Sequence, residues 1–170
     1  MAYPLLIEQS VELVSAQIKS VFNTSLQEVD NQYDDGISLE PISENAVYIS
    51  NKIQSLDLPS VFILAGPMAF DYTGDPNYLN GKTDLVVVVA SEEIGAEKMQ
   101  RKAWRYMRAL FECLGHVSLN SADGRLQIQC VPRRTGTTEP LVEKLQEFGQ
   151  KFRSDAVLEL SLLHYEKNLT

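Results

Sequence analysis

The stretch Leu58-Pro59-Ser60-Val61-Phe62-Ile63-Leu64-Ala65 opens the part of the chain that decides the fold, and a second apolar run, Leu85-Val86-Val87-Val88-Val89-Ala90, follows it. Both runs are of strand length and rich in β-branched and aromatic residues, which favours a buried pleated sheet over a short helix. No helical pattern lies between them, and parallel neighbours would need one. The two runs therefore predict antiparallel strands.

Residues 94–114 come next and have the spacing of an amphipathic helix that ends at Gly115. The expected core positions recur every three or four residues and are Ala103, Met107, Leu110, Phe111 and Leu114. A basic stripe recurs at the same spacing on another face and consists of Lys98, Arg101, Lys102, Arg105 and Arg108. Trp104 lies near the edge of the core positions, where we expect a packed or partly exposed anchor.

The other elements follow from simple periodic patterns. Residues 6–29 predict a first helix, Arg125–Val131 alternates as a strand does, and Ala156–Tyr165 predicts a final strand. A short third helix is predicted to start near Pro140, with Leu141, Leu145, Phe148 and Phe152 on one face. The run Val47–Ile49 fits either a short edge strand or a helical turn.

This order of elements predicts a single α+β domain over residues 1–170. We expect a mostly antiparallel mixed sheet of about four strands, flanked by two long helices and one short helix. The segment from Phe70 to Lys82 is long and full of turn formers, so it predicts a protruding hairpin or loop. We expect this loop to act as an interaction arm through its aromatic residues, which are Phe70, Tyr72 and Tyr78.

Composition and charge restrict the class of protein. Hydrophobic residues make up 44% and charged residues 22% of the chain, which is ordinary for a globular domain. No apolar run approaches the roughly 20 residues of a membrane span, and the first eight residues lack the basic region of a signal peptide, so we expect a cytosolic protein. A net charge of -8 argues against general affinity for nucleic acid or anionic membranes.

The charges are also separated along the chain. From Glu28 to Glu44 six acidic residues occur without any Lys or Arg, whereas the 94–114 helix carries the basic stripe. The stripe fits a solvated face, a protein interface or, less well, a nucleic-acid contact. In a head-to-tail ring, one subunit's helix could lie against the next subunit's acidic segment. We therefore expect a subunit interface in which Lys98, Arg101, Arg105 and Arg108 meet acid from the 28–44 segment, including Asp34 and Asp35.

Patterns that carry catalytic or cofactor chemistry are weak. No Gly-rich phosphate loop follows a strand, and Cys113 and Cys130 lack metal-ligand spacing, so we expect two core thiols. Cys113 and His116 could pair as nucleophile and base, but no orienting group is evident. Asp71, Asp75 and Asp84 are spaced unlike a calcium loop. We expect no enzyme activity, no cofactor and no metal.

The element order resembles that of the tail terminators and related neck proteins of long-tailed bacteriophages. The resemblance lies in the strand Leu58–Leu64, the long loop, the strand Asp84–Val89, the helix containing Arg105–Leu110 and the last strand, Ala156–Tyr165. It covers most of the chain from about Leu6 onward. The acidic loop after the first helix and the segment Thr138–Lys151 depart from the smaller members of the family.

The resemblance implies a virion protein of the tail or neck that assembles in the host cytoplasm. Family members form six-fold rings on top of the tail tube, stop its polymerisation and give the head connector a docking surface. The implied partners are other copies of the chain in a hexameric ring, the tail tube protein, the head connector or stopper protein and, in tails that have one, the sheath. Another neck or tail-completion component remains an alternative, as does a small ligand-binding domain or enzyme, which would need a polar pocket.

Overall fold

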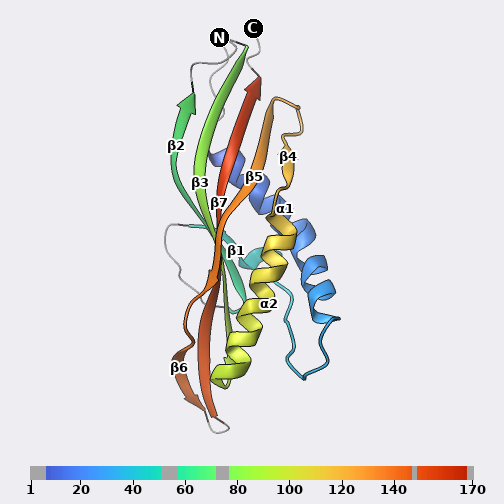
Figure 1. The fold of residues 1–170 in the computed structure, drawn as a ribbon, viewed down its shortest axis with the longest axis vertical. Coiled ribbons are helices and arrows are strands. Elements are labelled where there is room, and N and C mark those ends of the chain that lie inside the picture. The colour runs from blue at the N-terminus through green and yellow to red at the C-terminus, as the bar shows by residue number, and fades with distance from the viewer. Residues whose placement is uncertain (1–6, 51–56, 72–76, 147–148, 168–170) are drawn as a thin grey trace.

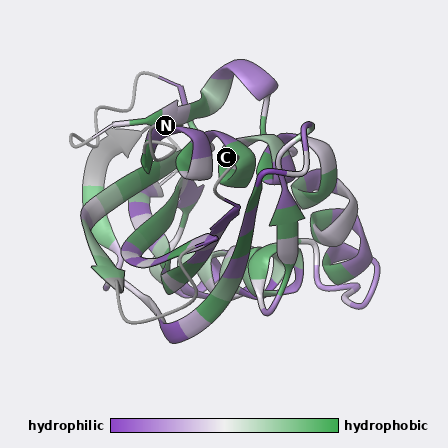
Figure 2. Ribbon diagram, turned by 90° about the horizontal axis from the view of Figure 1, so that it is seen from above, coloured by the Kyte–Doolittle hydropathy of each residue, from purple (hydrophilic) through white to green (hydrophobic). Residues whose placement is uncertain are grey.

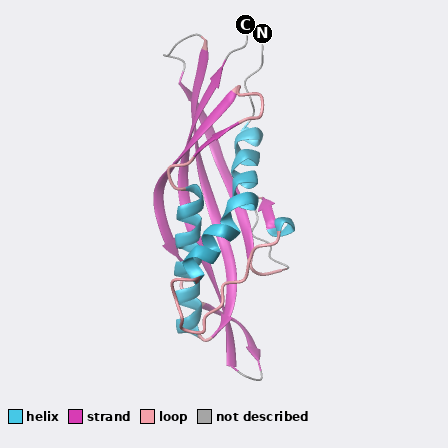
Figure 3. Cartoon of the chain, turned by 90° about the vertical axis from the view of Figure 1, so that its right-hand side faces the viewer, coloured by secondary structure: helices cyan, strands magenta, loops and turns pink. Residues whose placement is uncertain are grey.

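The computed structural model describes residues 7–50, 57–71, 77–146 and 149–167. Its centre is a sheet of seven strands, and two long helices pack on one face of that sheet (Figures 1 and 3). The elements in chain order are α1 (Ile7–Asp30), the 3₁₀ turn η1 (Glu44–Ala46), β1 (Val47–Ile49), β2 (Ser60–Asp71), β3 (Tyr78–Ile94), α2 (Ala96–Leu114), β4 (Ser118–Asn120), β5 (Leu126–Thr137), β6 (Leu141–Gln146) and β7 (Gly149–Lys167).

The strand order is β1-β2-β3-β7-β5-β4, and β6 pairs with β7 beyond the end of β5. Among the described strands, only β1 and β2 run parallel, and every other pair is antiparallel, including the predicted pair β2 and β3. The sheet is curled into a half-barrel, as the view from above in Figure 2 shows. The prediction of about four strands flanked by three helices is therefore wrong.

The predicted third helix is the clearest error. Residues 141–146 form β6, which turns back at Gly149 and pairs with the start of β7, Leu141 opposite Arg153 and Val142 opposite Phe152. Gly149 has a φ of 139°, a backbone conformation that residues with a side chain rarely adopt. The spacing of the leucines predicts a helix here, but the backbone N–H and C=O groups of this segment form hydrogen bonds with the long strand β7 instead. Phe148 lies outside the described residues.

The predicted long loop is also shorter than expected. β2 continues to Asp71 and β3 begins at Tyr78, with Phe70 opposite Gly81 and Asp71 opposite Asn80. The segment is therefore a hairpin whose arms belong to the sheet, and Tyr72 lies outside the described residues. The strand predicted at Arg125–Val131 likewise runs on to Thr137, because a bulge between Pro132 and Arg134 absorbs the irregularity.

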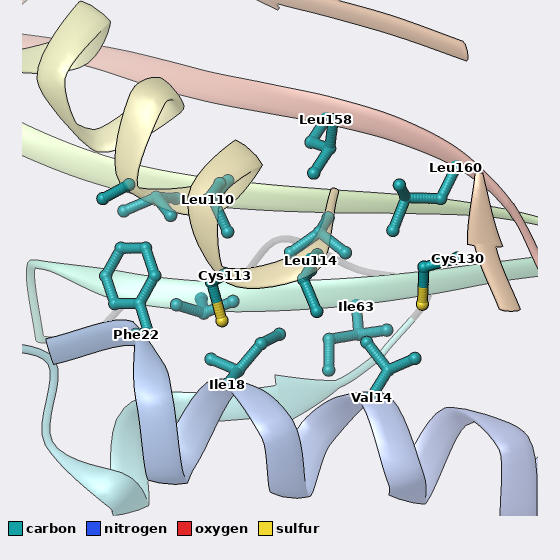
Figure 4. Close-up of a cluster of buried hydrophobic side chains, with 14 of the residues drawn as sticks. Val14, Ile18, Phe22, Ile63, Leu110, Cys113, Leu114, Cys130, Leu158 and Leu160 are labelled. Atoms are coloured by element: carbon teal, nitrogen blue, oxygen red, sulfur yellow. The ribbon is translucent and has the colours of Figure 1, made fainter. Parts of the chain in front are cut away.

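The two predicted long helices are confirmed, and their apolar faces build the core with one face of the sheet. Figure 4 shows side chains from the two helices and the strands pointing toward one another, among them Val14, Ile18, Phe22, Ile63, Leu110, Leu114, Leu158 and Leu160. Cys113 and Cys130 are both free and buried there, as predicted, and burial raises the pKa of each thiol to about 12. Phe111, which was expected in the core, is exposed because the buried arc of α2 runs through Tyr106 and Ala109 instead.

Strand length sets the shape of the molecule. β3 and β7 pair without interruption from Tyr78 opposite Lys167 to Ile94 opposite Lys151, 17 residues of β3. At roughly 3.4 Å per residue this ladder spans about 55 Å, whereas the 19 residues of α2 span about 28 Å at 1.5 Å per residue. The sheet thus extends beyond helix α2 (Figure 1).

Candidate functional site

The basic stripe on α2 divides into two groups with different surroundings. Lys102 belongs to the buried group, with a side chain only 3% exposed. Its Nζ lies 2.6 Å from Glu40 Oε2 and 3.3 Å from Glu93 Oε2, and it donates to the backbone oxygen of Glu92 at 3.1 Å. All three partners belong to the same chain. The ammonium is therefore matched inside the protomer.

Arg105 is the second buried member of the stripe, with a side chain 6% exposed. Its guanidinium makes a two-pronged contact with Asp35, in which Nη1 donates to Oδ1 at 3.1 Å and Nη2 donates to Oδ2. It also lies over the ring of Tyr33, 4.0 Å from the centroid. The hydrogen bond from Arg105 holds the pKa of the Asp35 carboxyl below its usual value.

Tyr106 completes the attachment of the acidic segment to α2. Its hydroxyl donates to the backbone oxygen of Glu40 at 2.8 Å, and its ring stacks on Phe22 of α1. Burial raises the pKa of this hydroxyl far above its usual value. Basic helix and acidic segment do meet, as their charges suggested, but Asp35 with Arg105 and Glu40 with Lys102 meet within one chain. An intermolecular role for these pairs is not needed to explain their charges.

The other basic residues of α2 face outward. Arg101 pairs with Glu97 at 2.8 Å and Arg108 with Glu112 at 3.0 Å, each one helical turn away, and both guanidiniums stay about half exposed. Lys98 and the predicted partner Asp34 are exposed as well. Their assignment to a subunit interface stays a prediction.

A groove lies between this outer side of α2 and the start of the acidic segment. Its volume is about 440 Å³, and it is lined by Tyr33, Glu97, Gln100, Arg101, Trp104, Arg105 and Arg108. Trp104 is 53% exposed, which agrees with the predicted position near the edge of the core; its role as an anchor stays a prediction. Its place in a groove with a basic rim was not visible in the sequence, because Tyr33 comes from a segment about 70 residues away. Trp and Arg are the residue types that most often dominate protein interfaces.

Two further exposed apolar groups occupy the ends of the sheet. At the β6 end, Leu141 is 70% exposed and Val142 52% exposed, and Ile94 of β3 is exposed nearby. At the opposite end, the predicted arm residues Phe70 and Tyr78 are exposed, together with Tyr165 of β7. Both groups lie on strands that continue past the core. Exposed apolar groups of this kind often mark contacts with other proteins.

The buried His164 and the earlier candidates Cys113, His116 and Asp84 are held in structural contacts. His164 is buried, with Nδ1 2.8 Å from Ser10 Oγ and Nε2 3.0 Å from Thr83 Oγ1, and burial lowers its pKa to about 4. Cys113 contacts the backbone oxygen of Gln17, whereas His116 lies against the edge of the Phe111 ring. Asp84 bonds to Ser161 and Arg133.

Within the described ranges, no three His, Cys, Asp or Glu residues are grouped to hold a metal ion. Neither described helix is long and apolar enough to cross a membrane.

No protein-family model and no curated protein sequence matches this chain. Among solved structures, it is similar to a chain of the "Virion of native gene transfer agent (GTA) particle". The two share 18% sequence identity and a TM-score of 0.48, over 90% of this chain and 93% of that one.

Proposed function

We propose that this protein is a structural subunit of a phage-type virion, and specifically a tail terminator. It acts as a ring of identical subunits between the tail tube and the head connector. The observation that supports this best is that exposed apolar side chains lie at both ends of the sheet, where the strands extend beyond the core. A subunit with partners above and below would need contact surfaces at these two places.

The exposed residues are unusual for a free monomer. Because successive side chains on a strand point to opposite faces, exposure of both Leu141 and Val142 means that neither face of the sheet is covered at this end. The other end has Phe70, Tyr78 and Tyr165 exposed on three adjacent strands. Each group would be stabilised by burial against another protein.

The finer assignment depends on the resemblance in element order to tail terminators. In this proposal six copies form the ring, the two ends of the sheet contact the tail tube protein and the connector or stopper protein, and the sides of the subunits contact each other. A sheath would meet the outside of the ring in a contractile tail. The protein has no catalytic step and no cofactor, and the ring is part of the virion neck.

The test is assembly of this protein with a tail tube protein from the same genome. Size-exclusion chromatography with light scattering should give a closed oligomer, and negative-stain micrographs should show rings, alone or at one end of each tube. Tubes polymerised with the protein present should be shorter than tubes polymerised without it. A protein that neither self-associates nor binds tube ends would contradict the proposal.

A further inference from the structure

The end of β3 lies beside no other described strand on the side away from β7. β3 pairs with β2 only as far as Ala90, which lies opposite Ser60, whereas its pairing with β7 continues to Ile94. We call residues 91–94 on this side the β3 edge. A strand edge presents a row of backbone N–H and C=O groups, so it can pair with an extended segment of another molecule.

The neighbouring contacts define where the backbone groups of the β3 edge point. Gly95 donates its N–H to the backbone oxygen of Gln150 in β7 at 3.1 Å. Because the C=O and N–H of one trans peptide point in opposite directions, the C=O of Ile94 points away from β7. In an antiparallel strand, both backbone groups of a residue point to the same side, and the side alternates along the strand. The backbone groups of Glu92 and Ile94 therefore face the open side of β3.

Two side chains already bind backbone groups of this edge. Lys102 of α2 donates from Nζ to the backbone oxygen of Glu92 at 3.1 Å, and Oε1 of Glu93 accepts the N–H of Ile94 at 2.9 Å. The other carboxylate oxygen of Glu93, Oε2, lies 3.3 Å from Lys102 Nζ. The two side chains thus hold each other in place, and together they satisfy one acceptor and one donor of the edge.

A pocket beside the β3 edge leaves room for an approaching segment. Its volume is about 260 Å³, and its lining includes residues 91–94, Leu58, Pro59 and Lys102. An added strand would have to displace Lys102 Nζ from the Glu92 oxygen. The Lys102 side chain is only 3% exposed, and separating a buried ammonium from its partners costs free energy.

We propose that Lys102 and Glu93 protect the β3 edge from pairing with a second copy of this chain. The protection operates in a monomer and in a ring alike, so it does not depend on the proposed function. Short edge strands and charged side chains, lysine especially, are the means by which sheets avoid edge-to-edge pairing. The strands that end the sheet on its two sides, β1 and β4, have only three residues each. At the end of β3, the two charged side chains take the place of such a short strand.

The test removes both caps without leaving a buried charge. In the double variant Lys102→Met and Glu93→Met, the Glu92 oxygen and the Ile94 N–H lose their side-chain partners. Size-exclusion chromatography with light scattering should show a species heavier than any that the parent forms. Self-association should tighten on the order of tenfold, the factor expected from two newly available hydrogen bonds of ordinary net strength. Lys102→Met alone frees one group and should give a smaller shift in the same direction.

A matched control separates the lost caps from the added methionines. The double variant Glu97→Met and Arg101→Met also removes one acid and one base that form an ion pair, but on the outer side of α2. It leaves the β3 edge capped and should not form the heavier species. Circular dichroism and thermal melting of each variant show that the protomer stays folded.

Proline at position 94 identifies the edge that pairs. Ile94→Pro removes the N–H that faces the open side, and this N–H bonds to the Glu93 side chain, so the change spares the ladder with β7. Added to the uncapped double variant, it should return the mass to that of the parent.

The outcomes distinguish this protection from the ring. Folded uncapped variants that keep the parent's mass at every concentration would overturn it. A heavier species that persists after Ile94→Pro, or that the Glu97 and Arg101 control also forms, would overturn it as well. A parent that neither self-associates nor binds tube ends would overturn the proposed function alone, because each variant is compared with the mass of the parent whatever that mass is.

Discussion

The inner and outer sides of helix α2 carry the same residue types but use them differently. Lys102 and Arg105 are almost fully buried and bind acids brought by the 34–40 segment and by Glu93. Arg101 and Arg108, one position before Lys102 and three after Arg105, stay half exposed and form ion pairs with Glu97 and Glu112 of the same helix. A basic stripe that recurs at helical spacing can therefore combine a buried structural cluster with an exposed surface.

Substitutions on the buried side of α2 should lower the stability of the protomer more than substitutions on its outer side. The largest loss is expected for the acidic residues that face Lys102. The double change Glu40→Gln and Glu93→Gln leaves the buried ammonium without a carboxylate, and we expect it to lower the free energy of unfolding by about 3 kcal/mol. Urea denaturation at neutral pH measures this.

The change Lys102→Met is the control, because it removes the charge together with its need for partners and should cost no more than about 1 kcal/mol. A double variant as stable as the parent would show that Lys102 does not depend on these acids.

A smaller loss is expected at Tyr106. The change Tyr106→Phe removes the hydroxyl that donates to the Glu40 backbone oxygen and keeps the ring on Phe22. We expect a loss of about 1 kcal/mol, the usual net contribution of one hydrogen bond. The midpoint of thermal unfolding measures it, and an unchanged midpoint would mean that the 34–40 segment is not anchored through this bond.

The contribution of the Asp35–Arg105 pair to stability should show mainly in the stability measured at acidic pH. Because the folded-state pKa of Asp35 lies below 3.8, the usual value for an aspartate, this group stabilises the fold above that pH, and the contribution is lost as pH falls through the folded pKa. The parent should therefore lose more stability than Asp35→Asn between about pH 4 and lower values. Urea midpoints across this range compare them, and parallel curves would show that the pair has no energetic role.

The outer side should give the smallest change in protomer stability. Arg101→Ala and Arg108→Ala remove exposed pairs along one helix, so each should change the free energy of unfolding by no more than about 0.5 kcal/mol. Urea denaturation at protein concentrations where the protein is monomeric measures this change in the free energy of unfolding without a contribution from assembly. A loss above about 1 kcal/mol would mean that the outer arginines support the fold as the inner cationic residues do.

Elements that depend on local sequence patterns were predictable, whereas those that depend on contacts between distant residues were not. Helices α1 and α2 were predictable because their apolar residues recur at helical spacing, and β2 and β3 because their β-branched runs are continuous. Residues 141–146 were misassigned because their strand depends on pairing with β7, a partner that comes later in the chain.

The candidate surface was visible only in part, for the same reason. The basic residues of α2 and the exposed aromatic residues Phe70 and Tyr78 could be named from the sequence. The division of the stripe could not, because the course of the 34–40 segment over α2 is a tertiary contact. Ion pairs between positions about 60 to 70 residues apart leave no periodic trace. The Trp104 groove was missed because Tyr33 reaches it from that same segment.

Strand β7 lies in the middle of the sheet, yet it follows all the other described strands in the chain. During synthesis, β3 and β5 leave the ribosome before β7, the strand that pairs with both. Until β7 emerges, the edges of β3 and β5 that will face it have no hydrogen-bonding partner. Open edges of this kind promote aggregation of incomplete chains. The sheet closes only through contacts between distant positions, such as Leu85 with Leu160, and such topologies fold slowly. Folding of this protein is therefore completed after translation of β7, and truncation before Gly149 removes the strand on which both halves of the sheet depend.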